Sequence, residues 1–165
     1  MRPVPLPVGP NQESVWDYPR PPRCEKASAR IEIEFDGLVV ASTDQAYRVV
    51  ETSHPPTYYL PTNAFRPGTL VVSRRNQSWC EWKGAAVYWS IVGSTRTAPD
   101  CAWSYPNPTS GYRSITGHVA VYAHTMDRCT VDGETAIPQP GNFYGGWVTS
   151  NVIGPFKGIP GSMGW

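Results

Sequence analysis

Alternating apolar and polar side chains predict a β-hairpin at residues 31–40. Positions 31–36 read Ile-Glu-Ile-Glu-Phe-Asp, which is the two-residue period of a strand that buries one face. The pair Asp36-Gly37 then precedes the apolar run 38–40, and an Asp-Gly pair between such runs favours the tight turn of a hairpin. A second Asp-Gly pair at 132–133, between short β-prone runs, predicts a second hairpin.

Most of the remaining pattern predicts further short strands. Runs rich in β-branched and aromatic residues, separated by Gly, Pro, Ser and Asn, lie at 47–51, 69–73, 79–82, 85–92, 102–105 and 118–122. Helical signals are few: residues 42–46 favour one short helical turn, and residues 110–116 favour a short helix. The sequence therefore predicts a mostly β fold, a single compact barrel-like or tent-like antiparallel β domain with one or two short helices.

The two ends of the chain differ from this middle part. Residues 1–29 predict an extended Pro-rich arm, because proline fixes φ and removes a backbone donor. Trp16 and Tyr18 within the arm are costly to leave in water, so we expect the arm to pack on the domain. Residues 30–137 predict the core domain, and residues 138–165, rich in Gly, Pro and aromatics, predict an irregular tail that covers it.

Length and charge narrow the class of protein. The 165 residues favour one domain, and 14 Lys and Arg against 13 Asp and Glu leave a net charge of +1. A nearly neutral chain is unlike a nucleic-acid binder, which needs clustered basic residues. The longest uncharged stretch, 135–156, is interrupted by prolines and glycines and does not predict a membrane helix. We therefore expect neither nucleic acid nor membrane as a partner.

The cysteines and the start of the chain bear on its compartment. Four of the first ten residues are prolines, where a secretory signal needs a helical apolar run, so we expect a cytoplasmic protein. The four cysteines contain no Cys-x-x-Cys pair and predict reduced thiols, with no metal site. Phosphate-loop, zinc-protease and nucleophile-elbow motifs are absent, and we expect no cofactor.

The first cluster of candidate functional residues surrounds the pair Pro55-Pro56. Glu51, His54 and Tyr58 lie on a segment stiffened by these prolines, which can hold an acid or base near its target. The alternative interpretation is structural: Glu51 and His54 satisfy backbone groups, and Tyr58 and its neighbour Tyr59 cover the core.

The second cluster is the segment 80–90, in which Lys83 lies at the edge of an apolar strand. Gly84 permits a bulge that redirects Lys83, and strand alternation places Tyr88 on the face opposite Val87. Lys83 can bind a carboxylate or phosphate, or attack a carbonyl, and its charge favours a thiolate at Cys80. A surface lysine and a small buried thiol are the alternative.

The third cluster lies around the predicted strand at 102–105. Trp103 and Tyr105 share one strand face and can form a stacking wall for a planar ligand, although aromatics at this spacing also build cores. His118 begins the next predicted strand and is either a binding or a structural histidine.

Taken together, the segments 51–61, 80–90, 102–108 and 117–122 resemble the bacterial family designated domain of unknown function 427, over about residues 30–137. Family members often read Cys-Pro-x-Lys-Gly-x-Ala-x-Tyr at the segment that begins with Cys80, and this chain departs from that pattern at Glu81. The N-terminal arm and the C-terminal tail are similar to those of one subgroup of this family. The resemblance implies a β-rich, barrel-like domain with a central pocket and no established reaction. The family is sometimes labelled nucleotidyltransferase-like, but the paired aspartates for two Mg²⁺ ions are absent here.

These observations predict a cytoplasmic protein that binds a small planar or anionic organic ligand in a central aromatic pocket. The expected ligand-binding residues are Tyr58, Lys83, Tyr88, Trp103, Tyr105 and His118. One alternative is an enzyme that uses Cys80 or Lys83 together with Glu51 or His54 as acid or base. Another is an interaction module that uses the arm and the tail to bind a partner or to form a homodimer.

Overall fold

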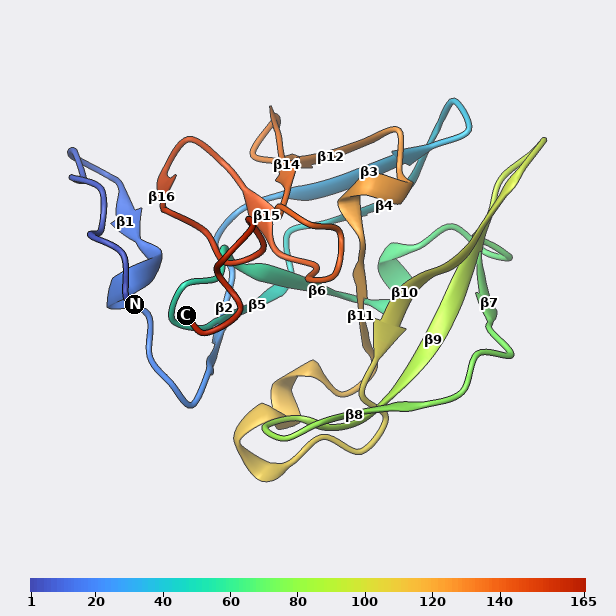
Figure 1. The fold of residues 1–165 in the computed structure, drawn as a ribbon. Helices are drawn as coiled ribbons and strands as arrows, with labels where there is room; N and C mark the ends of the chain where they lie inside the picture. The colour runs from blue at the N-terminus through green and yellow to red at the C-terminus, as the bar shows by residue number, and fades with distance from the viewer.

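Two antiparallel sheets contain most of the strands in the computed structural model, which describes residues 1–165 (Figure 1). The large sheet has the spatial order β2 (Arg23–Lys26), β5 (Tyr47–Val50), β6 (Thr57–Pro61), β11 (His118–Val121), β10 (Thr97–Ser104), β9 (Gly84–Val92) and β7 (Leu70–Val72), and β8 (Ser78–Cys80) also pairs with β9. The small sheet has the order β13 (Glu134–Thr135), β12 (Arg128–Val131), β3 (Ile31–Phe35) and β4 (Leu38–Thr43). Two short pairs complete the strands: β1 (Glu13–Ser14) with β16 (Val152–Ile153), and β14 (Ile137–Pro138) with β15 (Trp147–Val148).

Both predicted hairpins are confirmed, and their turns have the backbone that an Asp-Gly pair favours. Asp36 and Gly37, between β3 and β4, have φ values of 53° and 79°. Asp132 and Gly133, between β12 and β13, have φ values of 49° and 81°. Two consecutive positive φ angles match the right-handed twist of the flanking strands, so these local turns set the register of the small sheet.

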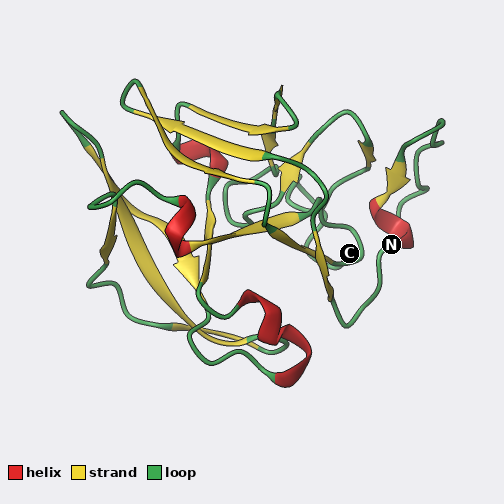
Figure 2. Ribbon diagram, turned by 180° about the vertical axis from the view of Figure 1, so that it is seen from behind, coloured by secondary structure: helices red, strands yellow, loops and turns green.

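Helical structure is limited to four short 3₁₀ segments, visible in Figure 2. They are η1 (Val15–Asp17), η2 (Thr62–Ala64), η3 (Ser110–Ile115) and η4 (Ala123–Thr125). The helix predicted at 110–116 corresponds to η3, but the helical turn predicted at 42–46 is wrong. There Thr43 Oγ1 accepts a hydrogen bond from the Gln45 N–H at 2.9 Å, and the Ala46 carbonyl accepts from the Ala27 N–H at 2.9 Å. None of the helical segments has the length or apolarity to span a bilayer.

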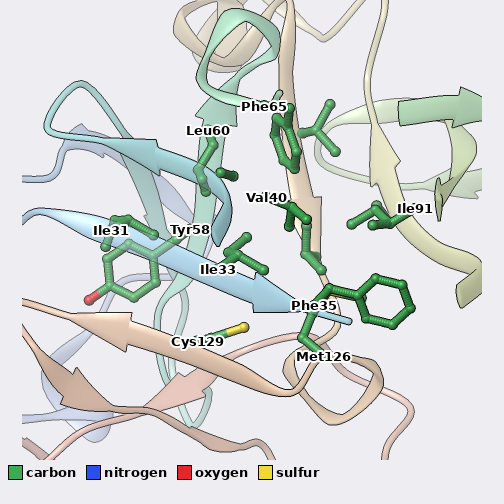
Figure 3. Packing of buried hydrophobic residues seen from close by; sticks show 14 of the residues in the cluster. Ile31, Ile33, Phe35, Val40, Tyr58, Leu60, Phe65, Ile91, Met126 and Cys129 are labelled. Atoms are coloured by element: carbon green, nitrogen blue, oxygen red, sulfur yellow. The ribbon is translucent and has the colours of Figure 1, made fainter. Parts of the chain in front are cut away.

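The interior core lies between the two sheets (Figure 3). Alternation along β3 buries Ile31, Ile33 and Phe35 on this side, as the sequence pattern predicted. From the large sheet, Tyr58 and Leu60 of β6 face the same core. The opposite face of the large sheet carries a second, aromatic cluster.

The predicted mostly β, antiparallel, tent-like domain is confirmed, whereas closure into a barrel is not. The large sheet ends at β2, which pairs only with β5, and at β7, which pairs only with β9. Two open edges mean that the sheet curves without meeting itself.

The N-terminal arm packs beside the tail, and the two chain ends lie near one another in both Figure 1 and Figure 2. Trp16 and Tyr18 are each 6% exposed, and they pack with Val50 and Val152. The arm is shorter than the expected segment 1–29, because residues 23–26 form β2 of the large sheet. The proline run ends at Pro22, so backbone N–H donors for a strand are continuous only from residue 23 onward.

The tail is anchored by one side chain that enters the interior core. Trp147 of β15 is 1% exposed, its ring lies 5.3 Å from that of Tyr58, and its indole N–H donates to the Val121 carbonyl at 3.1 Å. A buried indole with its N–H satisfied contributes apolar burial without a stranded donor. The residues around Trp147 are therefore held against the large sheet.

Candidate functional site

A cavity of about 860 Å³ lies on the aromatic face of the large sheet. Its floor comes from β5, β6, β9 and β10, one side from the β8–β9 hairpin, and the other side from residues 139–145 and 157 of the tail. This volume is within the usual range of about 300–1,000 Å³ for small-molecule sites. No three His, Cys, Asp or Glu side chains are grouped so that they could hold a metal ion.

Aromatic rings form the walls of the cavity. Trp103 of β10 and Tyr105, which directly follows the last residue of that strand, lie on the same face, as predicted, and Tyr59 of β6 joins them. The Tyr59 ring lies 6.4 Å from both of these rings, and the Trp103 ring lies 4.5 Å from that of Tyr122. Their spacing matches that of interacting aromatic pairs, so the walls are mutually supported before any ligand enters.

Lys83 reaches the cavity from the turn between β8 and β9. Gly84 follows it with a φ of 106°, a conformation that glycine adopts without strain. The half-buried Lys83 ammonium lies 5.7 Å from the Tyr105 ring centroid and 6.0 Å from that of Tyr112. It forms no ion pair with a carboxylate, whereas Glu51 is 3.3 Å from Arg20. Cys80 lies beside Gly84 in the same hairpin and also lines the cavity.

The polar end of the cavity is built around His54. The His54 Nδ1 lies 2.9 Å from the Gln139 side-chain nitrogen, and its Nε2 lies 3.7 Å from Glu51 Oε2. The ring meets that of Tyr144 edge-on at 4.7 Å. Burial, followed by the positive charges of Lys157 and Arg20, lowers the pKa of His54 to about 4. His54 is therefore neutral at pH 7.

Seven of the residues singled out from the sequence line this one cavity: Glu51, His54, Cys80, Lys83, Tyr88, Trp103 and Tyr105. Two others lie elsewhere. Tyr58 faces the interior core, on the opposite side of β6 from Tyr59. Tyr59 therefore lines the cavity at the position that the sequence predicted for Tyr58. His118 packs against Tyr47 at 5.4 Å outside the cavity, and its Nδ1 lies 2.9 Å from the Thr116 carbonyl oxygen.

Several cavity residues were not predicted, and most of them come from the tail. Gln139, Tyr144 and Lys157 all line the cavity although they follow the predicted core domain. Tyr59 was passed over in favour of Tyr58, and strand alternation alone left both choices open. For the tail residues, the only signal in the sequence was an aromatic-rich composition, which does not specify a contact.

Tyr58 reaches a second, more polar cavity of about 750 Å³ between the arm, β2 and the β12–β13 hairpin. There Arg48 forms ion pairs with Glu13 and Glu25. Arg48 and Glu13 belong to β5 and β1, so this network joins the arm to the large sheet. Arg48, Glu13 and Glu25 are thus paired with one another, and their network stabilises the contact between the arm and the sheet.

Comparison with protein families identifies residues 23–132 as a match to a domain of unknown function, DUF427. The match spans two thirds of the chain and includes the β8–β9 hairpin and β10. The chain belongs to the DUF427 family. No protein of curated function matches it.

The DUF427 segment contains one part of the cavity and not the other. Lys83, Trp103, Tyr105 and His54 lie within it, whereas Gln139 lies beyond its last matched residue. The arm before residue 23 is also outside the match, so the subgroup resemblance of the two ends stays a prediction. In this DUF427 protein the aromatic walls belong to the family segment, and the tail completes the polar end.

Proposed function

We propose that this DUF427 protein binds a small planar organic anion in the aromatic cavity, with Lys83 as the partner of the ligand's charge. The observation that carries the proposal is the half-buried Lys83 ammonium, which faces aromatic rings and has no carboxylate partner. A charged hydrogen-bond donor in such surroundings favours an anionic acceptor. The rings of Trp103 and Tyr105 supply faces on which a planar molecule can stack.

The geometry favours binding over covalent catalysis. An enzyme with Cys80 or Lys83 as nucleophile needs an acid or base within hydrogen-bond reach. No hydrogen bond or ion pair joins either residue to Glu51 or His54, although all four line the same cavity. We place the binding function in a reducing compartment such as the cytoplasm, because all four cysteines are free thiols.

Two fluorescent probes test the role of Lys83. The first is 8-anilinonaphthalene-1-sulfonate, an aromatic anion with a planar naphthalene ring. The second is N-phenyl-1-naphthylamine, the same ring system without the sulfonate. Lys83→Met keeps the apolar stem and deletes the charge, so it should weaken sulfonate binding by about 10- to 150-fold, the value of a charge-assisted hydrogen bond. Binding of the neutral probe should change by less than about threefold.

Lys26→Met is the matched control, because Lys26 is an exposed lysine of β2 outside the aromatic cavity. It should leave the binding of both probes unchanged. Equal weakening of both probes by Lys83→Met would assign Lys83 to packing and overturn its charge role. If neither probe binds to the wild-type protein, the proposed small-molecule function is wrong.

A further inference from the structure

Gln139 has only one possible amide orientation. Its side-chain oxygen accepts a hydrogen bond from the Gly146 N–H at 3.1 Å, and its side-chain nitrogen donates to the Lys157 carbonyl at 2.9 Å. A backbone N–H only donates and a backbone carbonyl only accepts, so the two ends of the amide cannot be exchanged. The second amide hydrogen then points to His54 Nδ1, 2.9 Å away. Gln139 is 1% exposed, and these partners account for its buried polar atoms.

This orientation determines where His54 carries its proton. Because Gln139 donates to Nδ1, that nitrogen must be an acceptor, and the proton of the neutral ring is on Nε2. A second proton would have to sit on Nδ1 and face the amide hydrogens, donor against donor. The low pKa of His54, which burial and the charges of Lys157 and Arg20 cause, agrees with this arrangement. His54 is thus a fixed Nε2–H donor at neutral pH and does not act as a general base.

Beside this donor lies a carboxylate acceptor, Glu51, whose ion-pair partner is Arg20. His54 Nε2 is 3.7 Å from Glu51 Oε2, which is longer than a hydrogen bond. Glu51 Oε2 also lies 3.3 Å from a guanidinium nitrogen of Arg20. Both side chains line the cavity. Its polar end therefore presents one N–H donor and one carboxylate acceptor side by side, with neither consuming the other.

We propose that His54 and Glu51 form a donor–acceptor pair that binds the lactam or amide edge of a planar ligand. The His54 Nε2–H donates to the ligand's carbonyl oxygen, and the Glu51 carboxylate accepts from the adjacent ligand N–H. A carboxylate at this end would face Glu51 and be repelled, so the pair also selects against misplacing the ligand's acidic group. The inference rests on the proposed function. It adds that the ligand carries a lactam or amide edge bound by His54 and Glu51, apart from the acidic group bound by Lys83.

The polar end and the stacking wall are connected through a single tail segment. A Cβ at Gly145 would lie 2.1 Å from the Trp103 ring, and one at Gly146 would lie 2.6 Å from Gln139 Oε1. Only glycines let the chain pass this close to both groups. Tyr144, the residue before them, meets the His54 ring edge-on. One ligand of modest size can therefore contact the Trp103 wall and the His54–Glu51 pair together.

The tautomer of His54 is measured first, because it needs no ligand. Long-range ¹H–¹⁵N NMR spectra of the imidazole should show the proton on Nε2, and the ring should stay neutral down to about pH 5. The charged and titratable groups around the ring are Glu51, Lys157, Arg20, Lys83 and Tyr144. A proton on Nδ1 in the wild-type protein, or titration near an ordinary pKa of about 6.5, would overturn the inference.

Gln139→Glu tests the positioning role of the amide. The substitution keeps the shape and replaces the donor that faces Nδ1 by an acceptor, so His54 should move its proton to Nδ1 or become charged near pH 7. Gln45→Glu is the matched control, because Gln45 is an exposed glutamine whose amide donates to Asp44 and which does not line the cavity. An unchanged His54 spectrum in folded Gln139→Glu would refute the positioning role. If that variant does not fold, the wild-type spectrum alone decides.

A pair of lactam probes tests the ligand class. Isoquinolin-1(2H)-one has a lactam edge, and its N-methyl derivative has the same ring without the N–H. The lactam should bind to the wild-type protein about 10- to 100-fold more tightly than the methylated probe, as loss of a hydrogen bond to a charged acceptor predicts. Glu51→Met should abolish this preference. Glu81→Met removes another carboxylate from the rim of the same cavity and should leave the preference intact.

The outcomes separate this inference from the proposed function. If the sulfonate probe binds through Lys83 while the two lactam probes bind equally or not at all, the cavity binds anions but the donor–acceptor pair is wrong. If the preference survives Glu51→Met, the lactam edge is bound elsewhere and the inference is also wrong. If the lactam preference depends on Glu51 while Lys83→Met affects neither naphthyl probe, the pair stands and the charge role of Lys83 fails.

Discussion

Replacing Trp16 by alanine tests whether the N-terminal arm is an integral part of the folded domain. Trp16 lies in η1 and is 6% exposed. Its indole N–H donates to the Pro155 carbonyl at 3.0 Å, and its ring lies 5.6 Å from that of Trp165. The side chain thus joins the arm to the last part of the tail, and its removal should loosen both ends of the chain.

The size of the effect follows from the area that the indole buries. A buried tryptophan removes about 150–250 Å² from water, which at roughly 25 cal/mol per Å² corresponds to about 4–6 kcal/mol. Residual burial in the unfolded chain lowers such values by about 10–40%. We therefore expect Trp16→Ala to lower the free energy of unfolding by about 3–5 kcal/mol, the range usual for deleting a buried large aromatic.

Urea unfolding followed by far-UV circular dichroism measures this change, and Trp79→Ala is the matched control. Trp79 is 75% exposed, so its replacement should alter the free energy of unfolding by less than about 0.5 kcal/mol. The melting temperature of Trp16→Ala should fall by roughly 10 °C, since each kcal/mol corresponds to about 2–4 °C in a chain of this size. A loss below about 1 kcal/mol would mean that the arm contributes little to the fold and that its packing does not persist in solution.

Three further predictions concern the tail, acid stability and the thiols. Gly145→Ala should weaken binding of N-phenyl-1-naphthylamine and destabilise the fold by about 1–3 kcal/mol, because the added Cβ would lie 2.1 Å from the Trp103 ring. Hydrogen bonds from the backbone and side chain of Thr95 lower the pKa of Asp36 to about 2, so its contribution to stability is present above about pH 4 and lost as the pH falls toward 2. Asp36→Asn should reduce the change of the urea unfolding midpoint with pH over that interval. Burial raises the pKa of Cys101 to about 11 and that of Cys129 to about 12, so thiol reagents should label these two only after unfolding, as mass spectrometry can report.

Each of these predictions has a contrary result. Gly164→Ala, where an added Cβ meets nothing within 4 Å, should be neutral, and an equal effect at both glycines would exclude the steric explanation. An unchanged slope of stability against pH in Asp36→Asn would show that other carboxylates govern acid unfolding. Labelling of Cys129 in the native state as fast as that of half-buried Cys80 would show that the interior core opens readily.

The features that were predictable from the sequence are those that local chemistry determines. The Asp36-Gly37 turn adopts positive φ angles at both positions, and this preference requires no knowledge of the rest of the fold. The shared face of Trp103 and Tyr105 follows from the geometry of any strand. The position of Lys83 at a turn beside glycine was also visible, although the rings that it faces are distant in sequence.

Strand alternation failed where both faces of a strand are buried. Tyr58, Tyr59 and Leu60 are at most 5% exposed, so no polar position marks the side of β6 that faces water. A one-residue shift exchanges the two faces, and the choice of Tyr58 over Tyr59 depended on that shift. In the same way, the helical turn expected at 42–46 was excluded by pairing of the Ala46 carbonyl with Ala27, a contact that local signals do not contain.

The polar end of the cavity lies beyond sequence reasoning for a different reason. His54 and Gln139 are 85 positions apart, and their hydrogen bond depends on where the tail crosses the large sheet. That crossing is determined by Trp147, whose ring enters the interior core beside Tyr58. A contact of this kind arises only after both sheets have packed, so no short sequence motif predicts it.

The division of the cavity between the DUF427 segment and the tail determines which part of the chain controls the proton of His54. The matched segment, residues 23–132, contains the aromatic walls, Lys83 and His54, but not the amide of Gln139. Without that donor at Nδ1, the imidazole is free to carry its proton on either nitrogen or to be charged. In this chain the tail removes that freedom, because Gln139 is held by Gly146 and Lys157 before it contacts His54.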